Sequence, residues 1–282
     1  WIGIVSAIPI LLFIIITLLF YFPPFQNWAV RQATSYASEK TGMQISIARV
    51  NLEFPLNLGI EGIKVIQQND SLPQVKDTVA RVSRVIVDVQ LLPLLRKEVE
   101  IDRLELNGIK FNTTNFIHEA RVKGTIGHLI LRSHGIDLKG EILRLNDVRL
   151  AEAKVTVELS DTVPPDTSES KNYWKIYAEH LDVRRTDVTV HMPGDTLQVQ
   201  AYLGKATVDD GYFDLYKGLY RIRRLDCTGG RLNYDNNFAT RIRGVDYNHL
   251  SLSDITLGID AFSYCKPRLS MYLRACTFKE KS

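Results

Sequence analysis

The sequence has few residues of the kinds that form catalytic or metal centres. Its 282 residues include only 3 cysteines and 6 histidines. Cys227, Cys265 and Cys276 lie too far apart for a metal or redox motif, and the histidines lack the HExxH spacing of metalloproteases. No GxSxG, P-loop or GxGxxG motif is present. We therefore expect no enzyme activity, no catalytic residue, no metal and no cofactor.

Neither sign of charge dominates the sequence. The 35 Lys and Arg residues and 32 Asp and Glu residues give a net charge of +3, and all of them follow Phe22. A nucleic-acid-binding protein would show a basic stripe or a recognisable module. The basic clusters here are short, such as Arg221-Ile222-Arg223-Arg224, and in a strand they alternate between the two faces. This argues against nucleic acid as a partner.

The longest uncharged run comprises residues 1–22. A helix of this length spans roughly 33 Å, enough to cross a hydrocarbon core of about 30 Å. We predict a transmembrane anchor over 1–22. The alternative is a cleaved secretory signal, but the apolar part of a signal is about 7–15 residues long and ends at small residues. This run ends at Tyr21-Phe22-Pro23-Pro24.

The next segment, 23–42, has the pattern of a short amphipathic helix. The residues on its apolar face are Phe25, Ala29, Ala33, Tyr36 and Ala37. Aromatic side chains cluster where a membrane interface is expected, namely Tyr21, Phe22, Phe25 and Trp28. We predict an interfacial helix, and packing of the same face on the following domain is the alternative.

From residue 43 onward the apolar period changes from helical to two. Alternating or β-branched runs such as Val85–Val89 and Val155–Leu159 are separated by turn sequences such as Pro193-Gly194-Asp195. The pattern predicts a mainly β, mostly antiparallel body over 43–282. The low-complexity stretch 161–172 is expected to be an exposed loop.

A repeat of apolar residues underlies these strands, at positions i, i+2, i+5, i+7 and i+12. It occurs at Val99/Ile101/Leu104/Leu106/Phe111, Leu143/Leu145/Val148/Leu150/Val155, Ile176/Ala178/Leu181/Val183/Val188 and Tyr220/Ile222/Leu225/Cys227/Leu232. The odd step from i+2 to i+5 reverses the face of a strand, so each unit should contain a bulge or corner. Strands bent at the same place form an elongated, curved, open hydrophobic groove, and repeated units of this kind stack as an array.

An open apolar wall would bind acyl chains at about 0.8 kcal/mol per buried CH₂. Each candidate wall residue is alternatively an ordinary core residue. The candidates are Ile45, Ile47, Ile101, Leu104, Leu106, Val148, Leu150, Val155, Val157, Val188, Val190, Leu225, Leu232, Leu269 and Leu273.

Four stretches carry a resemblance to a known family. They read ATSYASEKTG (33–42), QISIARVNLEF (44–54), VDVQLLPLLRKEVEIDRLELNGIKFN (87–112) and DLYKGLYRIRRLDCTGGRLNYD (214–235). With the apolar N-terminal run, they resemble the N-terminal region of AsmA-like proteins, closest to the TamB branch. The resemblance implies a single-pass protein of the bacterial inner membrane with a β-groove body in the periplasm, and a chain that continues beyond residue 282.

The resemblance implies two alternative functions. One is movement of glycerophospholipids between the inner and outer membranes during outer-membrane biogenesis. The other is a scaffold that helps a BamA-like outer-membrane barrel to insert or secrete proteins. The expected partners are phospholipids, the inner membrane and, through a part beyond this chain, such a barrel.

Overall fold

The computed structural model describes 30–31, 34–35, 38–39, 43–53, 57–68, 76–89, 101–113, 120–137, 140–159, 173–244 and 246–280. The predicted anchor (1–22) and loop (161–172) lie outside the described residues. Within the described ranges, the model contains no helix with the length and apolar character needed to cross a membrane.

One sheet contains all the strands. They are β1 (Gln44–Ser46), β2 (Arg49–Glu53), β3 (Asn57–Gln68), β4 (Lys76–Val89), β5 (Ile101–Asn112), β6 (Ala120–Asp137), β7 (Ile142–Leu159), β8 (Lys175–His191), β9 (Leu197–Asp214), β10 (Leu219–Asn236), β11 (His249–Cys265) and β12 (Arg268–Glu280). A 3-10 turn, η1 (Pro193–Asp195), joins β8 to β9. The order is β1-β3-β4 and then sequential to β12, with β2 also paired to β3.

All pairings are antiparallel except that between β7 and β8, which is parallel. The prediction of a mainly β, mostly antiparallel body is therefore confirmed. The parallel pair was not predicted, because a period of two reads the same in either strand direction.

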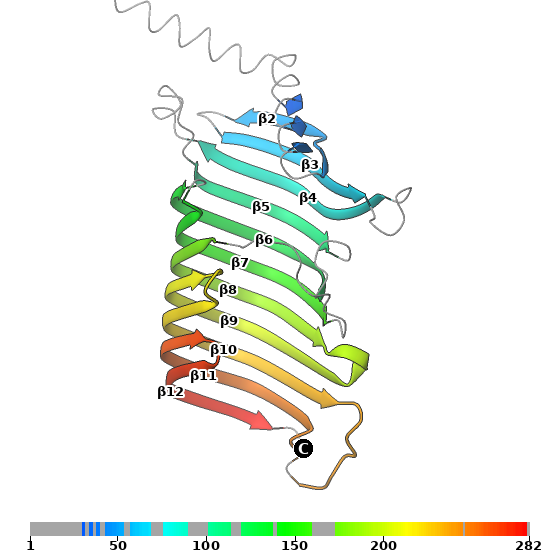
Figure 1. Ribbon diagram of the computed structural model, residues 1–282, viewed down its shortest axis with the longest axis vertical. Coiled ribbons are helices and arrows are strands. Elements are labelled where there is room, and N and C mark those ends of the chain that lie inside the picture. Colours follow the sequence, from blue (N-terminus) through cyan, green and yellow to red (C-terminus); the bar gives the residue numbers. More distant parts are fainter. Residues whose placement is uncertain are drawn as a thin grey trace, which may run out of the picture.

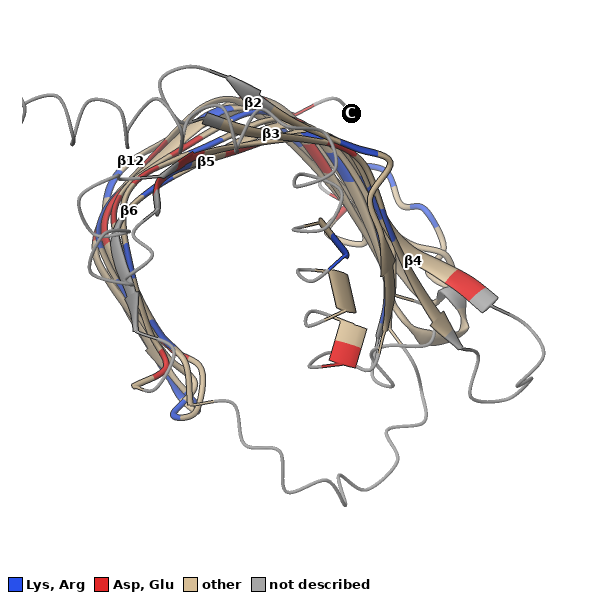
Figure 2. Cartoon of the chain, turned by 90° about the horizontal axis from the view of Figure 1, so that it is seen from above, with Lys and Arg blue, Asp and Glu red and all other residues tan. Residues whose placement is uncertain are grey.

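The sheet is a long ladder that bends into an open arc. Figure 1 shows the strands stacked in chain order along the long axis. Seen along that axis in Figure 2, the sheet curves strongly and its two sides do not meet. The described strands thus form one open layer, not two facing layers or a closed barrel.

The strands bend at residues with left-handed backbone conformation. Six strands each have a residue with positive φ at about the same level across the sheet, namely Gly62, Gly108, Glu152, Arg185, Gly229 and Asp254. Such a residue reverses the alternation of side chains, so apolar residues before and after it share a face. In β7, for example, Glu152 (φ 58°) separates Leu150 from Val155.

A second set of irregularities lies at the predicted odd step. Asp210 in β9 and Ala261 in β11 have φ values of 52° and 53°. The register between β7 and β8 omits Asn146 and Glu179. Each of them lies between positions i+2 and i+5 of its repeat unit. The predicted bend is confirmed in this part of the sheet, and the step from i+7 to i+12 contributes the bend at Glu152 and its counterparts.

Six residues of the predicted amphipathic segment are described, and all are helical. Val30, Thr34 and Ser38 are half-buried, whereas Ser35 and Glu39 are exposed. The backbone N–H of Ile45 donates to Ser38 Oγ over 3.0 Å, which ties this segment to β1. In Figures 1 and 2 these residues lie near β3, inside the arc.

Candidate functional site

The strand register gathers apolar side chains on one face of the sheet. Directly paired residues point to the same side, so their partners can be followed from strand to strand. One row from β3 to β12 contains only apolar residues, namely Leu58, Val87, Leu104, Leu131, Val148, Leu181, Val208, Leu225, Ile259 and Leu273. At about 4.8 Å per strand this row is roughly 43 Å long.

A second row runs parallel to the first. It consists of Ile60, Val85, Leu106, Leu129, Leu150, Val183, Ala206, Cys227, Leu257 and Cys276. Beyond the bend marked by Glu152, two more rows pass through Val155 and Val157 and continue to Val188 and Val190. We call the face that carries these rows the apolar face.

Most of the predicted wall residues lie on the apolar face. Those in its four rows are Leu104, Leu106, Val148, Leu150, Val155, Val157, Val188, Val190, Leu225, Leu232 and Leu273. Ile45 joins the Val155 row through Val65 and Phe111. Leu269 pairs with Tyr264 and belongs to a shorter aromatic row.

Two predicted residues are not placed on this face. Ile47 is half-buried but lies between β1 and β2, outside any strand. Ile101 pairs with Val89 next to a register shift, and its side chain is not among those described. The predicted interface residues Tyr21, Phe22, Phe25 and Trp28 lie outside the described residues.

Small side chains are unequally buried on the two faces. On the apolar face Val85, Val148 and Ala153 are only 5%, 8% and 3% exposed. On the opposite face, Thr125 and Thr228 are exposed. Burial also raises the pKa of the Cys227 thiol, so this cysteine stays protonated and packs as a small apolar residue.

Exposure rises at β12. Leu269 and Leu273 are 55% and 53% exposed. Within the described sheet β12 pairs only with β11, so its side chains have neighbours on one side. The apolar face is therefore least covered at this end.

The opposite face is polar and its charges are largely paired. Arg149 contacts Asp147 at 2.9 Å, and His180 Nδ1 lies 2.8 Å from Asp209 Oδ1. Arg184 Nε donates to Asp182 Oδ1 over 3.0 Å, and this hydrogen bond outweighs burial and lowers the pKa of Asp182. These contacts pair many of the charged groups of the polar face with one another.

Sequence reasoning missed the apolar residues of the intervening strands. Leu131 in β6, Val208 in β9 and Ile259 in β11 complete the first row. The repeat template covered β5, β7, β8 and β10 but not these strands. Their own alternation, as in Leu129-Ile130-Leu131, is the signal that could have found them.

Comparisons identify no family for this chain. No protein-family model matches it, and no curated protein matches it. Among the described residues, no group of three or more His, Cys, Asp and Glu side chains could hold a metal ion.

Proposed function

We propose that the protein is an inner-membrane-anchored β-groove that carries the acyl chains of glycerophospholipids across the periplasm along its apolar face. The observation that supports this most directly is the uninterrupted apolar row from Leu58 to Leu273. The apolar N-terminal run supports the membrane anchor, and the resemblance to AsmA-like proteins supports the inner-membrane and periplasmic location.

Lipid transport requires the apolar face to be the inside of the arc. Side chains converge on the concave face of a curved sheet and spread on the convex face. The burial of Ala206 and Cys227, against the exposure of Thr125 and Thr228, fits an apolar concave face. An apolar surface of this extent needs a covering in water.

Acyl chains suit this surface energetically. Burying ten methylenes contributes about 8 kcal/mol before the cost of ordering the chain is subtracted. The apolar rows offer no charged side chain that would fix one head group. A lipid would be held by area alone, and the same feature lets it slide from strand to strand.

Charge placed on the apolar face should abolish lipid binding. The test protein is the full chain, purified in mild detergent, and its lipids are extracted and measured by mass spectrometry. In the variant Leu104→Glu/Val148→Glu/Val188→Glu, we expect phospholipid recovery to fall to that of an unrelated single-pass membrane protein. The matched control is Thr125→Glu/Thr156→Glu/Thr189→Glu, which adds the same charge to the opposite face.

A photo-crosslinking residue separates bound lipid from lipid around the anchor. Placed at Leu106 it should form a phospholipid adduct, whereas at Thr125 it should not. Equal adducts at the two positions, or wild-type lipid recovery in the triple variant, would contradict the proposal. A scaffold function would survive the three glutamates, because it does not use the filled groove.

A further inference from the structure

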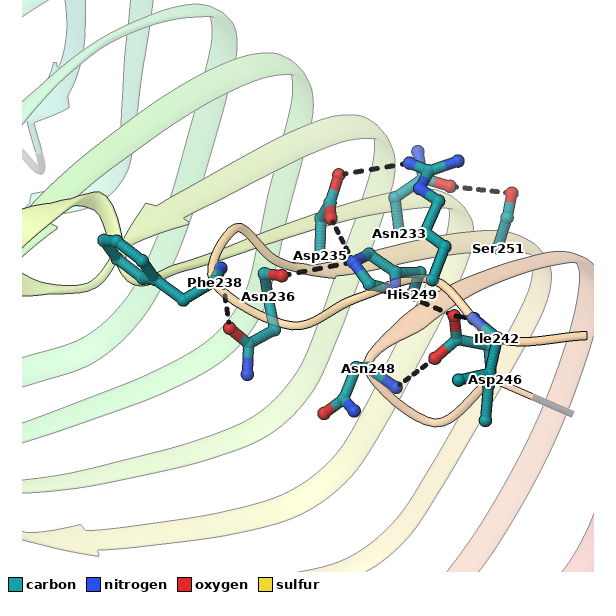
Figure 3. Close-up of polar contacts among 10 residues, drawn as sticks. Asn233, Asp235, Asn236, Phe238, Ile242, Asp246, Asn248, His249 and Ser251 are labelled. Atoms are coloured by element: carbon teal, nitrogen blue, oxygen red, sulfur yellow. Dashed lines mark hydrogen bonds and ion pairs between the residues drawn. The ribbon is translucent and has the colours of Figure 1, made fainter.

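A polar depression lies on the face opposite the apolar rows, over β9, β10 and β11. It consists of two adjoining hollows of 340 and 290 Å³ that share Gln200, Asn233 and Ser251. These three residues are side by side in the register of the three strands. Figure 3 shows Asn233 and Ser251 beside Asp235 and His249 in this region. We call it the β9–β11 depression.

Most of the lining groups are polar, and the charged ones balance. Asn233 Oδ1 accepts a hydrogen bond from Ser251 Oγ over 3.0 Å, which leaves the amide NH₂ of Asn233 as a donor toward the hollow. Two carboxylates, Asp187 and Asp235, are matched by two guanidinium groups, Arg231 and Arg241. The balance disfavours a strongly anionic or cationic ligand.

The side chain of Arg231 is oriented by a stacking contact. Its guanidinium lies over the ring of Tyr202, 4.3 Å from the ring centroid. The described residues give it no carboxylate within ion-pair distance, whereas Arg184, Arg224 and Arg274 each have one. The contact with Tyr202 therefore fixes the direction of the guanidinium N–H groups, and no described carboxylate forms an ion pair with them.

The floor at the other end of the depression is rigid. His249 is nearly buried, and its Nδ1 lies 2.8 Å from Asp246 Oδ2 while its Nε2 lies 3.1 Å from the carbonyl of Asn236. Asp246 also accepts from the backbone N–H groups of Ile242 and Asn248. Figure 3 shows these contacts joining the loop after β10 to the start of β11. A site fixed before binding loses less entropy when the ligand arrives.

We propose that the β9–β11 depression binds a neutral saccharide. Sugar hydroxyls both donate and accept, and adjacent hydroxyl pairs match the two-pronged amide, carboxylate and guanidinium groups found here. An acyl chain would leave these polar groups unpaired in the contact. The depression lies on the opposite face from the proposed lipid path, so either proposal can fail without the other.

The test measures saccharide binding to the full chain in a detergent without a sugar head group. Maltotriose, cellotriose and chitotriose are titrated by ligand-observed NMR. We expect at least one to bind with a Kd below about 10 mM, and Arg231→Ala or Gln200→Ala to weaken it roughly tenfold or more. Arg221→Ala is the matched control, because Arg221 lies on the same strand opposite Tyr212 and outside the depression.

Three results would overturn the proposal. The first is no binding by any of the three saccharides in this range. The second is equal loss of binding in Arg231→Ala and Arg221→Ala. The third is binding of inorganic phosphate that Arg231→Ala removes, without saccharide binding, because the site would then be an anion site.

Discussion

A single carboxylate organises the loop between β10 and β11. Asp246 is 8% exposed and accepts hydrogen bonds from the His249 ring and from two backbone N–H groups. Burial alone would raise the pKa of Asp246, but these hydrogen bonds outweigh burial and lower the pKa. The ionised form therefore holds the loop, and on it the exposed side chains Phe238, Ile242 and Tyr247.

The contribution of Asp246 to stability should depend on pH with a definite sign. Its folded pKa lies below the unfolded value of about 3.9, so the stabilisation is complete above that value and is lost as pH falls through the folded pKa. We expect Asp246→Ala to lower the hydrogen-exchange protection of the Ile242 and Asn248 amides roughly tenfold at pH 6. Wild-type protection at these amides should decline toward that of the variant as the pH falls through the lowered pKa of Asp246.

The same-size variant Asp246→Asn is the control for this experiment. It keeps an acceptor oxygen but cannot titrate, so its loop protection should not change with pH through this group. Loop protection that falls with acid as steeply in Asp246→Asn as in the wild type would show that the ionised carboxylate does not hold the loop.

At the scale of the strand, the bends depend on positive φ values. A side chain at Gly108 (φ 63°) would place its Cβ 2.6 Å from Ser83 Oγ, which donates to the Gly108 carbonyl. The equivalent bend in β7 is made by Glu152, which bears the cost of a left-handed L-residue, about 1–2 kcal/mol. The same corner is thus built with glycine in one strand and without it in another.

Exchanging these residue types should have effects of unequal size. We expect Gly108→Val to reduce the free energy of unfolding by about 1–3 kcal/mol, through the backbone conformation and the contact with Ser83. Glu152→Gly should stay within about 1 kcal/mol of wild type. Glycine removes the cost of the positive φ, but it also raises the entropy of the unfolded chain and removes an exposed ion pair with Arg185, so these effects largely cancel. Urea unfolding followed by far-UV circular dichroism measures both, and a larger loss in Glu152→Gly would refute this account of the bends.

Local sequence pattern predicted the strands and one of the two sets of bends, but not the contacts between distant strands. The alternation in Val155–Leu159 identifies β7, and the odd step from i+2 to i+5 locates the bend at Asp210, whereas the bend at Glu152 was not predicted. The apolar residues of the repeat proved to share one face, because each bend restores the alternation. Ile47 shows the limit, since the chain leaves the strand there to cross between β1 and β2.

The β9–β11 depression could not be read from the sequence. Gln200, Asn233 and Ser251 are far apart in the chain, and only the register of three strands brings them together. Arg231 looks like an ordinary charge in a strand until Tyr202 is found beneath it. Period and composition do not contain this long-range information.

At the scale of the whole molecule, the sheet is a one-dimensional ladder. Except at its β1–β3 end, each described strand pairs only with its neighbours in the chain, and no second layer packs across several strands. In such arrays stability is close to a sum of unit and neighbour contributions. A local change should therefore weaken nearby strands much more than distant ones.

Two variants at opposite parts of the ladder test this directly. Gly108→Val lies in β5, and Gly204→Val lies in β9, where a Cβ would come within 2.8 Å of the Gly229 carbonyl oxygen. We expect Gly108→Val to speed hydrogen exchange in β4–β6 and to leave β8–β10 near wild type, and Gly204→Val to do the reverse. The amides are measured strand by strand by mass spectrometry under native conditions. Equal acceleration over all strands in both variants would mean that the sheet unfolds as one cooperative unit, and a lipid filling the apolar face from end to end is one physical cause that would couple the strands in this way.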